Sequence, residues 1–235
     1  MKAALIVILM VAVALGLGTG FYRGQSTRSA ARADSLGAVL DSLAAEGDAL
    51  RQRNSALVAA LDTQMTVFSR AKQDEMNRLK STYEELVKDM RAEIADGQIQ
   101  ITQLADRLNV TMVDRILFPS GEADISPAGV RVLRRVGNIL KGTQGKVIRV
   151  EGHTDNVTIS PRLKDRFPSN WELSTTRASN VVRFLQDSVG IDPTRLQAVG
   201  LSQYHPVASN TTARGRSQNR RIEIGLLPEV TRESP

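Results

Sequence analysis

Gly152-His153-Thr154-Asp155-Asn156 is the stretch that decides the fold of this chain, together with Asn170 to Ala178 and Asn219-Arg220-Arg221-Ile222-Glu223. Asp155 follows an apolar strand pattern, and Arg177 stands in the first turn of the next predicted helix. A carboxylate can face an ammonium group, and a guanidinium beside free helix amides can hold a carboxylate. Asp155 and Arg177 are therefore predicted to bind a small zwitterion.

Short strands and helices alternate around these residues. Ser126-Pro127 is a typical helix start, and Ser174 is predicted to cap a second helix that Gly190 ends. Strands are predicted at residues 110–118, 146–152, 196–200 and 222–226. This order favours an α/β fold, a two-layer sandwich on a mixed sheet.

The three quoted motifs, in this order, resemble the OmpA-like C-terminal domain, a peptidoglycan-binding module. The resemblance covers about residues 109–227 and includes Ile116 to Ser126. It implies that Asp155 and Arg177 bind diaminopimelate, the zwitterionic branch of the stem peptide in Gram-negative peptidoglycan. It also implies a set of pocket-shaping residues: Thr154, Asn156, Asn170, Leu173, Arg220 and Arg221.

Two questions about this site stay open at the level of sequence. An ordinary salt bridge between Asp155 and Arg177 would also explain their pattern. Arg220 and Arg221 either pair within the domain or contact the ligand.

The segment from Pro161 to Ser169 is longer than the linker of porin-type members and resembles the MotB-type version. A motor stator needs an ionisable carboxyl within the membrane, and Ala3 to Tyr22 contains none. An accessory subunit of a motor or envelope transport complex is therefore kept as the alternative function.

A heptad pattern precedes the domain. Leu36, Leu43, Leu50 and Leu57 occupy d positions, and Asn54 lies at an a position. Leucine at d with one asparagine at a favours a parallel dimer. A single helix folded back on the domain is the alternative, because Gly47 weakens the zipper. The spacing resumes at Ile94, Ile101, Leu104 and Leu108 in a shifted frame, which indicates a stutter or break near Gly97 and predicts helix up to residue 108.

Residues 3–22 form an uncharged, mostly apolar run, long enough to cross a bilayer as a helix. An uncleaved anchor is favoured over a signal peptide, because the small-residue site Ala12-Val13-Ala14 lies inside the run. Arg23, Arg28 and Arg32 follow it, which favours a cytoplasmic C-terminus by charge counting. The resemblance to a cell-wall binder favours a periplasmic one, and the two indications conflict.

Composition excludes several classes. Residues 1–108 carry 13 basic and 13 acidic side chains, and residues 109–235 carry 18 and 12. The scattered arginines have no interleaved aromatic residues, which argues against nucleic acid. The chain has no cysteine, which excludes disulfides and a lipid-bearing cysteine. His153 is predicted to bond to backbone, and no metal site, cofactor or catalytic set is expected.

The sequence therefore predicts four segments: a membrane anchor or signal at 1–24, a coiled-coil stalk at 25–108, an OmpA-like domain at 109–228 and a disordered tail at 229–235. The predicted function is a non-catalytic, dimeric tether between membrane and peptidoglycan. Its predicted location is the inner membrane with a periplasmic domain, or the periplasm or outer membrane after cleavage. A wall-remodelling enzyme is the remaining alternative.

Overall fold

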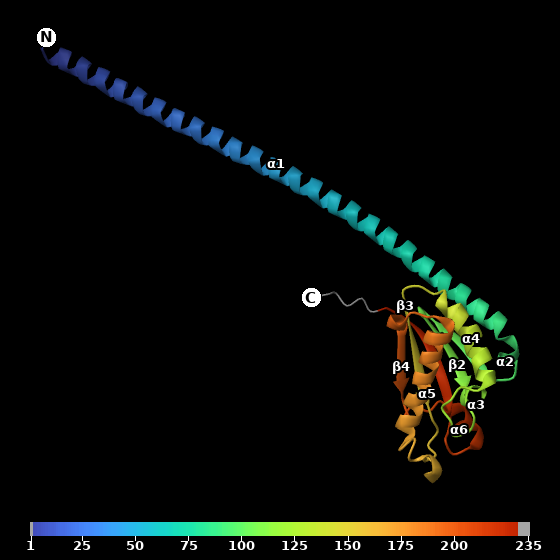
Figure 1. Cartoon of the computed structure of the whole chain (residues 1–235). Coiled ribbons are helices and arrows are strands. Elements are labelled where there is room, and N and C mark those ends of the chain that lie inside the picture. Colours follow the sequence, from blue (N-terminus) through green and yellow to red (C-terminus); the bar gives the residue numbers. More distant parts are fainter. Residues whose placement is uncertain (1, 230–235) are drawn as a thin grey trace. The chain divides into compact units, whose positions relative to one another are not determined.

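The computed structural model describes residues 2–229, with side chains at residues 9–13, 15 and 23–229. Helix α1 runs from Lys2 to Asp89 (Figure 1). The chain divides into two compact units between Ser69 and Arg70. Over the described residues, no helix has a stretch both long and apolar enough to cross a bilayer. The anchor predicted for residues 1–24 falls mainly on side chains outside the described set, and the tail lies outside it beyond Glu229.

The predicted heptad leucines lie on α1 and are exposed in the single chain. Between 53 and 67% of Leu36, Leu43, Leu50 and Leu57 is accessible, and Leu40 and Leu61 are similarly exposed. An apolar row of this length on a helix surface is typical of a helix that packs against a partner. The dimer itself stays a prediction.

Residues 99–113 form a β-hairpin, so the prediction of helix up to residue 108 is wrong. Strand β1 (Ile99–Leu104) pairs antiparallel with β2 (Arg107–Val113), after the short helix α2 (Arg91–Ala95). Gly97, with φ +65°, lies in the turn between α2 and β1. Ile99 and Ile101 alternate with polar residues, which is the period of a strand. The sheet thus includes residues that the sequence analysis assigned to the stalk.

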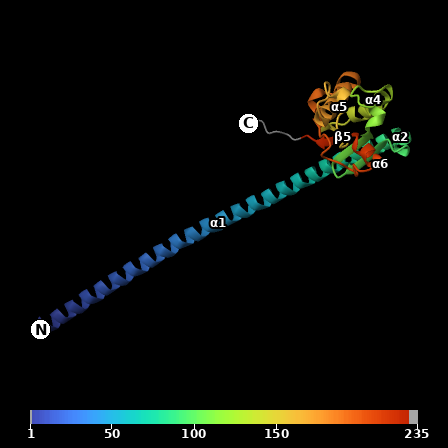
Figure 2. The same ribbon diagram turned by 90° about the horizontal axis from the view of Figure 1, so that it is seen from below.

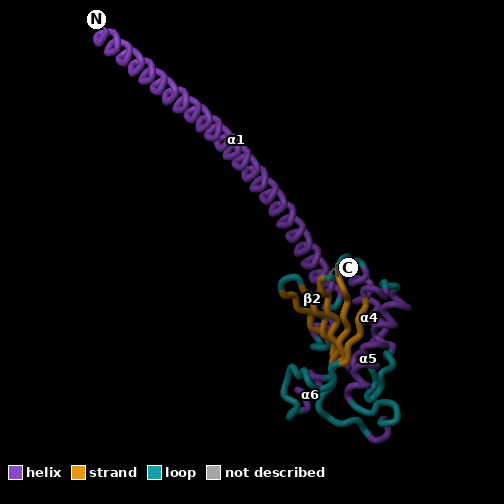
Figure 3. The backbone as a smooth tube through the Cα atoms, turned by 90° about the vertical axis from the view of Figure 1, so that its left-hand side faces the viewer, coloured by secondary structure: helices purple, strands orange, loops and turns teal. Residues whose placement is uncertain are grey.

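In the described part of the chain the sheet has five strands in the order β1-β2-β5-β3-β4. Figure 3 shows the strands side by side in orange. The remaining strands are β3 (Lys146–His153), β4 (Leu196–Gly200) and β5 (Arg221–Pro228). Only β3 and β4 are parallel, and the other pairs are antiparallel. The predicted mixed sheet is confirmed.

Strand β2 ends at Val113, and the predicted strand to Phe118 is wrong beyond that point. Residues Asp114–Leu117 form the short helix α3. The backbone N–H of Asp114 donates to the carbonyl oxygen of Arg220 at 3.0 Å. This bond continues the pairing of β2 with β5 one residue beyond Val113 and Arg221, and the chain then enters α3.

Helices α4 (Pro127–Lys141) and α5 (Asn170–Phe184) cover one face of the sheet and lie over β5 in Figure 2. Ser126 caps α4 through the Gly129 N–H at 3.0 Å, as predicted. Ser169, not Ser174, caps α5, because Ser169 and Glu172 form a capping box. Helix α5 continues through a π turn, η2 (Leu185–Val189), to Gly190. Three short helices complete the fold: η1 (Pro161–Leu163), η3 (Pro193–Arg195) and α6 (Ala213–Asn219).

The core includes the end of α1. Leu79, Leu86 and Met90 are buried with the apolar residues of the sheet, α4 and α5. Arg135 of α4 also donates to Glu93 at 2.6 Å and to Asp89 at 3.0 Å. The last turns of α1 therefore pack as part of the C-terminal unit.

Two glycines let β3 and β4 approach the first turns of α5. A Cβ atom at Gly152 would overlap the carbonyl oxygen of Ser174, and one at Gly200 would lie 2.7 Å from the Thr175 nitrogen. Neither position therefore has room for the Cβ atom of a larger residue. The close approach brings Asp155, just after β3, next to the start of α5.

The opposite face of the sheet buries a histidine between two acids. His153 is 3% exposed, and its Nε2 lies 3.9 Å from Glu151 and 3.8 Å from Glu223. Among the described residues neither ring nitrogen has a hydrogen-bond partner, so the predicted backbone bond is wrong. Burial, with the nearby charge of Arg221, lowers the pKa of His153 to about 4.

Substitution of Gly152 by alanine is expected to destabilise the C-terminal unit by about 1–3 kcal/mol, because the new methyl group meets backbone that cannot yield. The matched control is Gly225→Ala, since a Cβ there has 4.0 Å to its nearest neighbour, the carbonyl oxygen of Arg149. Urea unfolding followed by fluorescence of Trp171 measures both. Equal stability of the two variants would contradict the close packing.

Stability is also expected to fall as the pH drops from about 6.5 toward 4. An unfolded histidine takes up a proton near pH 6.5, whereas folded His153 has a pKa of about 4. The unfolded state therefore binds more protons in this window, and acid favours unfolding. In a His205→Gln variant His153 is the only histidine. NMR titration of its ring should show it still neutral at about pH 5, and a midpoint near the ordinary value would refute this.

Candidate functional site

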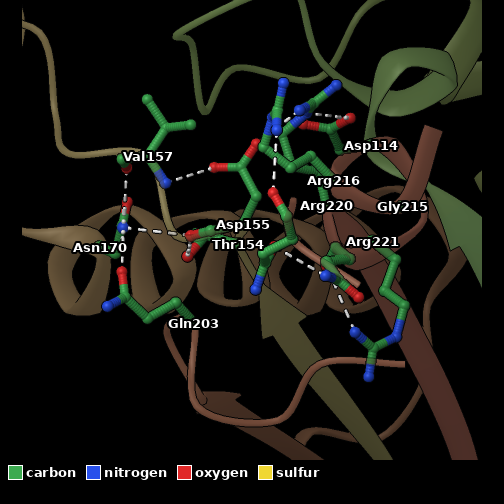
Figure 4. Close-up of polar contacts among 12 residues, drawn as sticks. Asp114, Thr154, Asp155, Val157, Asn170, Gln203, Gly215, Arg216, Arg220 and Arg221 are labelled. Atoms are coloured by element: carbon green, nitrogen blue, oxygen red, sulfur yellow. Dashed lines mark hydrogen bonds and ion pairs between the residues drawn. The ribbon is translucent and has the colours of Figure 1, made fainter. Parts of the chain in front are cut away.

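Asp155 lies two residues after the end of β3, with 6% of its surface exposed. Its Oδ1 accepts the Val157 N–H at 3.0 Å, and its Oδ2 accepts Nη1 of Arg220 at 2.5 Å (Figure 4). The carboxylate is thus held by a backbone amide on one side and by a guanidinium on the other. Since Arg220 is the partly exposed member of the pair, its side chain can move without opening the core.

Arg177 is buried on α5, with 3% exposed. Its Nε donates to the carbonyl oxygen of Glu122 at 2.9 Å, and its Nη1 donates to Oδ2 of Asp114 at 3.1 Å. The guanidinium also lies over the ring of Phe118, 4.9 Å from the ring centre. These contacts fix the position of the guanidinium.

Asp114 is a site residue that the sequence analysis missed. It is the first residue of α3, immediately after β2, and contacts both Arg177 and, at 3.7 Å, Nε of Arg220. Asp114 lies inside the strand predicted at residues 110–118 and outside the quoted motifs, so no sequence signal singled it out. Burial raises the pKa of Asp114, and the two arginines oppose that rise.

The four charged residues form an alternating series: Arg177, Asp114, Arg220 and Asp155. Asp155 and Arg177 therefore share one electrostatic site, but each has a different counter-ion. The simple alternative, a direct salt bridge between these two residues, is not the pairing in the structure. The series has no net charge, which suits a neutral zwitterion.

The predicted pocket-shaping residues differ in position. Asn170 joins three segments, donating to the carbonyl oxygens of Asp155 at 3.3 Å and Val157 at 3.0 Å and to Oε1 of Gln203 at 2.9 Å. The Thr154 hydroxyl donates to the carbonyl oxygen of Asp155 at 3.0 Å, and Asn156 is exposed beside it.

Leu173 lies in a small apolar cluster rather than against the carboxylate. It packs with Ala123 and with Phe167 of the long segment before α5. Through this cluster the segment that contains Phe167 packs against the loop that contains Glu122 and Ala123. The carbonyl oxygen of Glu122 accepts from Arg177. Leu173 therefore supports the site indirectly.

Arg220 and Arg221 have different surroundings. Arg220 lies at Asp155, whereas Arg221 is buried and donates to Glu223 at 2.5 Å and to the carbonyl oxygen of His205 at 3.2 Å. The side chain of Asn219 donates to the Ala208 carbonyl and accepts from its N–H, both at 2.9 Å. Arg221 and Asn219 thus hold the loop after β4.

Within the described residues, Glu151, His153 and Glu223 form the group whose ligand atoms are close enough to hold a metal ion. Arg221 already neutralises Glu223, and Asn109 donates to its other oxygen at 2.8 Å. The group lies on the sheet face opposite to α4 and α5.

Residues 117–220 match the OmpA family. Motility protein B of Bacillus subtilis is 37% identical over 164 residues, 70% of this chain and 60% of that protein. Protein YtxE of the same organism is 31% identical over 201 residues, 84% of this chain and 78% of YtxE. The peptidoglycan-binding protein ArfA of Mycobacterium tuberculosis is 34% identical over 121 residues, 52% of this chain and 35% of ArfA. The chain thus matches less than two thirds of motility protein B and of ArfA.

Solved structures agree with these matches. A MotB-like protein from Desulfovibrio vulgaris superposes with a TM-score of 0.61 at 28% identity, covering 70% of this chain and 99% of that one. The cell wall anchor of the T6SS from Pseudomonas aeruginosa gives 0.56 at 35% identity, covering 61% and 97%. The fold, the motifs around Asp155 and Arg177 and these matches lead to one conclusion: the chain belongs to the OmpA family and is of the MotB type.

Proposed function

We propose that this protein is a non-catalytic tether that binds peptidoglycan through the diaminopimelate of its stem peptide. The observation that carries the proposal is the neutral series of Arg177, Asp114, Arg220 and Asp155, whose two acids follow β2 and β3. The printed descriptions of ArfA as peptidoglycan-binding and of the T6SS protein as a cell wall anchor support this ligand.

The ligand exchanges one internal ion pair for two external ones. Arg220 swings away from Asp155, and the ligand ammonium takes its position at Oδ2. The ligand carboxylate then meets Arg220 and the edge of the Arg177 guanidinium that faces away from Asp114. Each buried charge keeps a counter-ion throughout, which limits the desolvation cost.

An enzymatic role has less support. General acid–base catalysis needs a carboxyl free to gain and lose a proton, and both acids of the site face arginines. A motor or transport accessory is the stronger second candidate, because motility protein B is 37% identical. The two roles are compatible if the tether holds a partner subunit against the wall, and a membrane pull-down separates them.

We place residues 1–24 in the inner membrane and the domain in the periplasm, where its ligand is found. Cleavage of the segment would instead release a periplasmic or outer-membrane-associated protein. We further propose that α1 pairs with a second copy of the chain through the exposed row of Leu36, Leu43, Leu50 and Leu57. Asn54 at an a position favours a parallel, in-register pair.

Asp155→Asn and Arg220→Ala are expected to weaken binding of a diaminopimelate stem peptide by about 2–5 kcal/mol, because each removes one charge contact to the ligand. Calorimetry with the peptide and cosedimentation with sacculi measure the loss. The matched control is Arg183→Ala, which removes an exposed arginine of α5. Unchanged affinity in folded Asp155→Asn and Arg220→Ala proteins would refute the site.

Arg177→Ala is expected to lower stability by about 3–5 kcal/mol as well as affinity, because it leaves Asp114 buried without its main partner. Arg177→Lys keeps the charge but loses the planar fork of donors. Urea unfolding of both variants separates the structural loss from the binding loss. Wild-type stability in Arg177→Ala would show that the pair is not structural.

A Leu43→Lys/Leu50→Lys double variant is expected to be monomeric, because two charges per chain would face each other in the seam. Ala45→Lys/Gln52→Lys adds the same charge on the outer face of the heptads and should remain dimeric. Sedimentation velocity of the full chain in detergent distinguishes the two. A monomeric wild-type protein would leave the stalk as a single helix.

A further inference from the structure

Two aromatic rings lie exposed against each other beside the charged site. Trp171 is 47% exposed and Tyr204 is 63% exposed, and their ring centres are 5.5 Å apart at an angle of 32°. Trp171 is the only tryptophan in a chain with nine aromatic side chains other than histidine. Large aromatic rings gain free energy by burial, so a paired exposed position calls for a contact outside the chain.

The two rings are held in place by the same bonds that build the site. Trp171 is in the first turn of α5, where its backbone N–H donates to the Ser169 hydroxyl at 3.1 Å. Tyr204 follows Gln203, whose amide oxygen accepts from Asn170 at 2.9 Å. Ser202 is tied to the Ser174 hydroxyl at 3.1 Å. The pair therefore stays outside the core without depending on flexible segments.

Asn170 connects this pair to the charged series. It precedes Trp171 in sequence, bonds to the residue before Tyr204, and donates to the carbonyl oxygen of Asp155. In Figure 4, Asn170 and Gln203 lie on one side of Asp155, and Arg220 lies on the other. A ligand at Asp155 thus has charges on one side and an aromatic surface on the other.

We propose that Trp171 and Tyr204 form a platform for a sugar ring of the glycan strand whose stem peptide occupies the charged site. One face of a pyranose presents mainly C–H groups, which pack against the negative face of an aromatic ring without needing a charge. This inference rests on the proposed function and adds a second class of ligand group to the same site. A polymer of sugars carrying charged peptides offers both groups close together.

The test compares two ligands with the same peptide: the free stem peptide and the disaccharide peptide. The full chain should bind the disaccharide peptide about three to ten times more tightly, the range expected for an aromatic contact. Trp171→Ala and Tyr204→Ala should reduce this ratio toward one and leave the affinity for the free peptide unchanged. Calorimetry measures all variants, and in the wild type the single tryptophan should change its fluorescence only with the sugar-bearing ligand.

Tyr204→Phe keeps the ring and should keep the ratio, whereas Phe68→Ala removes an exposed aromatic ring of α1 and should change nothing. Equal affinity of the wild type for the two ligands would overturn the platform and leave the peptide site standing. If neither ligand binds, the proposed function itself fails and the platform falls with it. A ratio that survives both alanine substitutions would place the sugar contact elsewhere.

Discussion

The buried ion pair between Asp114 and Arg177 is the constraint on which the site depends. It joins the end of β2 to α5, two elements that do not pair through backbone in the sheet. Since both groups have lost most of their water, each is stable only while the other is in place. This requirement fixes Arg177 in the absence of a ligand, whereas Arg220 is partly exposed and is the charge that the proposed binding mode displaces.

The sequence patterns located the strands around the site well, because β3, β4 and β5 are short and rich in apolar residues, and apolar and polar side chains alternate along much of β3 and β5. The sequence patterns gave a wrong prediction where the same residues fit two different structures. Ile94, Ile101, Leu104 and Leu108 fit a shifted heptad, but Gly97 ends the helix and the next residues pair as a hairpin. Ser169-x-x-Glu172 fits a capping box, and Ser174 also fits a cap; Ser169 caps α5, whereas the Ser174 hydroxyl accepts from the Ser202 backbone N–H.

The site was half predictable for a physical reason. Asp155 and Arg177 belong to motifs, so sequence could name them, but the partner of each comes from a segment far away in the chain. Asp114 lies 63 residues from Arg177, and Arg220 lies 65 residues from Asp155. Pairing over such separations is set by the sheet order, in which β5 lies between β2 and β3. The spacing of residues within one motif therefore cannot predict these partners.

The same sheet order explains how a small site can serve a tether. Asp114, Asp155 and Arg220 all lie next to ends of adjacent strands, so on the proposed function a pull on the ligand would be shared by the backbone ladder of β2, β5 and β3. On the proposed binding mode, Arg220 competes with the ligand ammonium for Asp155, so a single site would release its ligand readily. Two sites on one dimer would release independently, and the retained one would keep the other close to the wall. A tether of this kind could then attach strongly to the wall through several low-affinity sites, without any single site of high affinity.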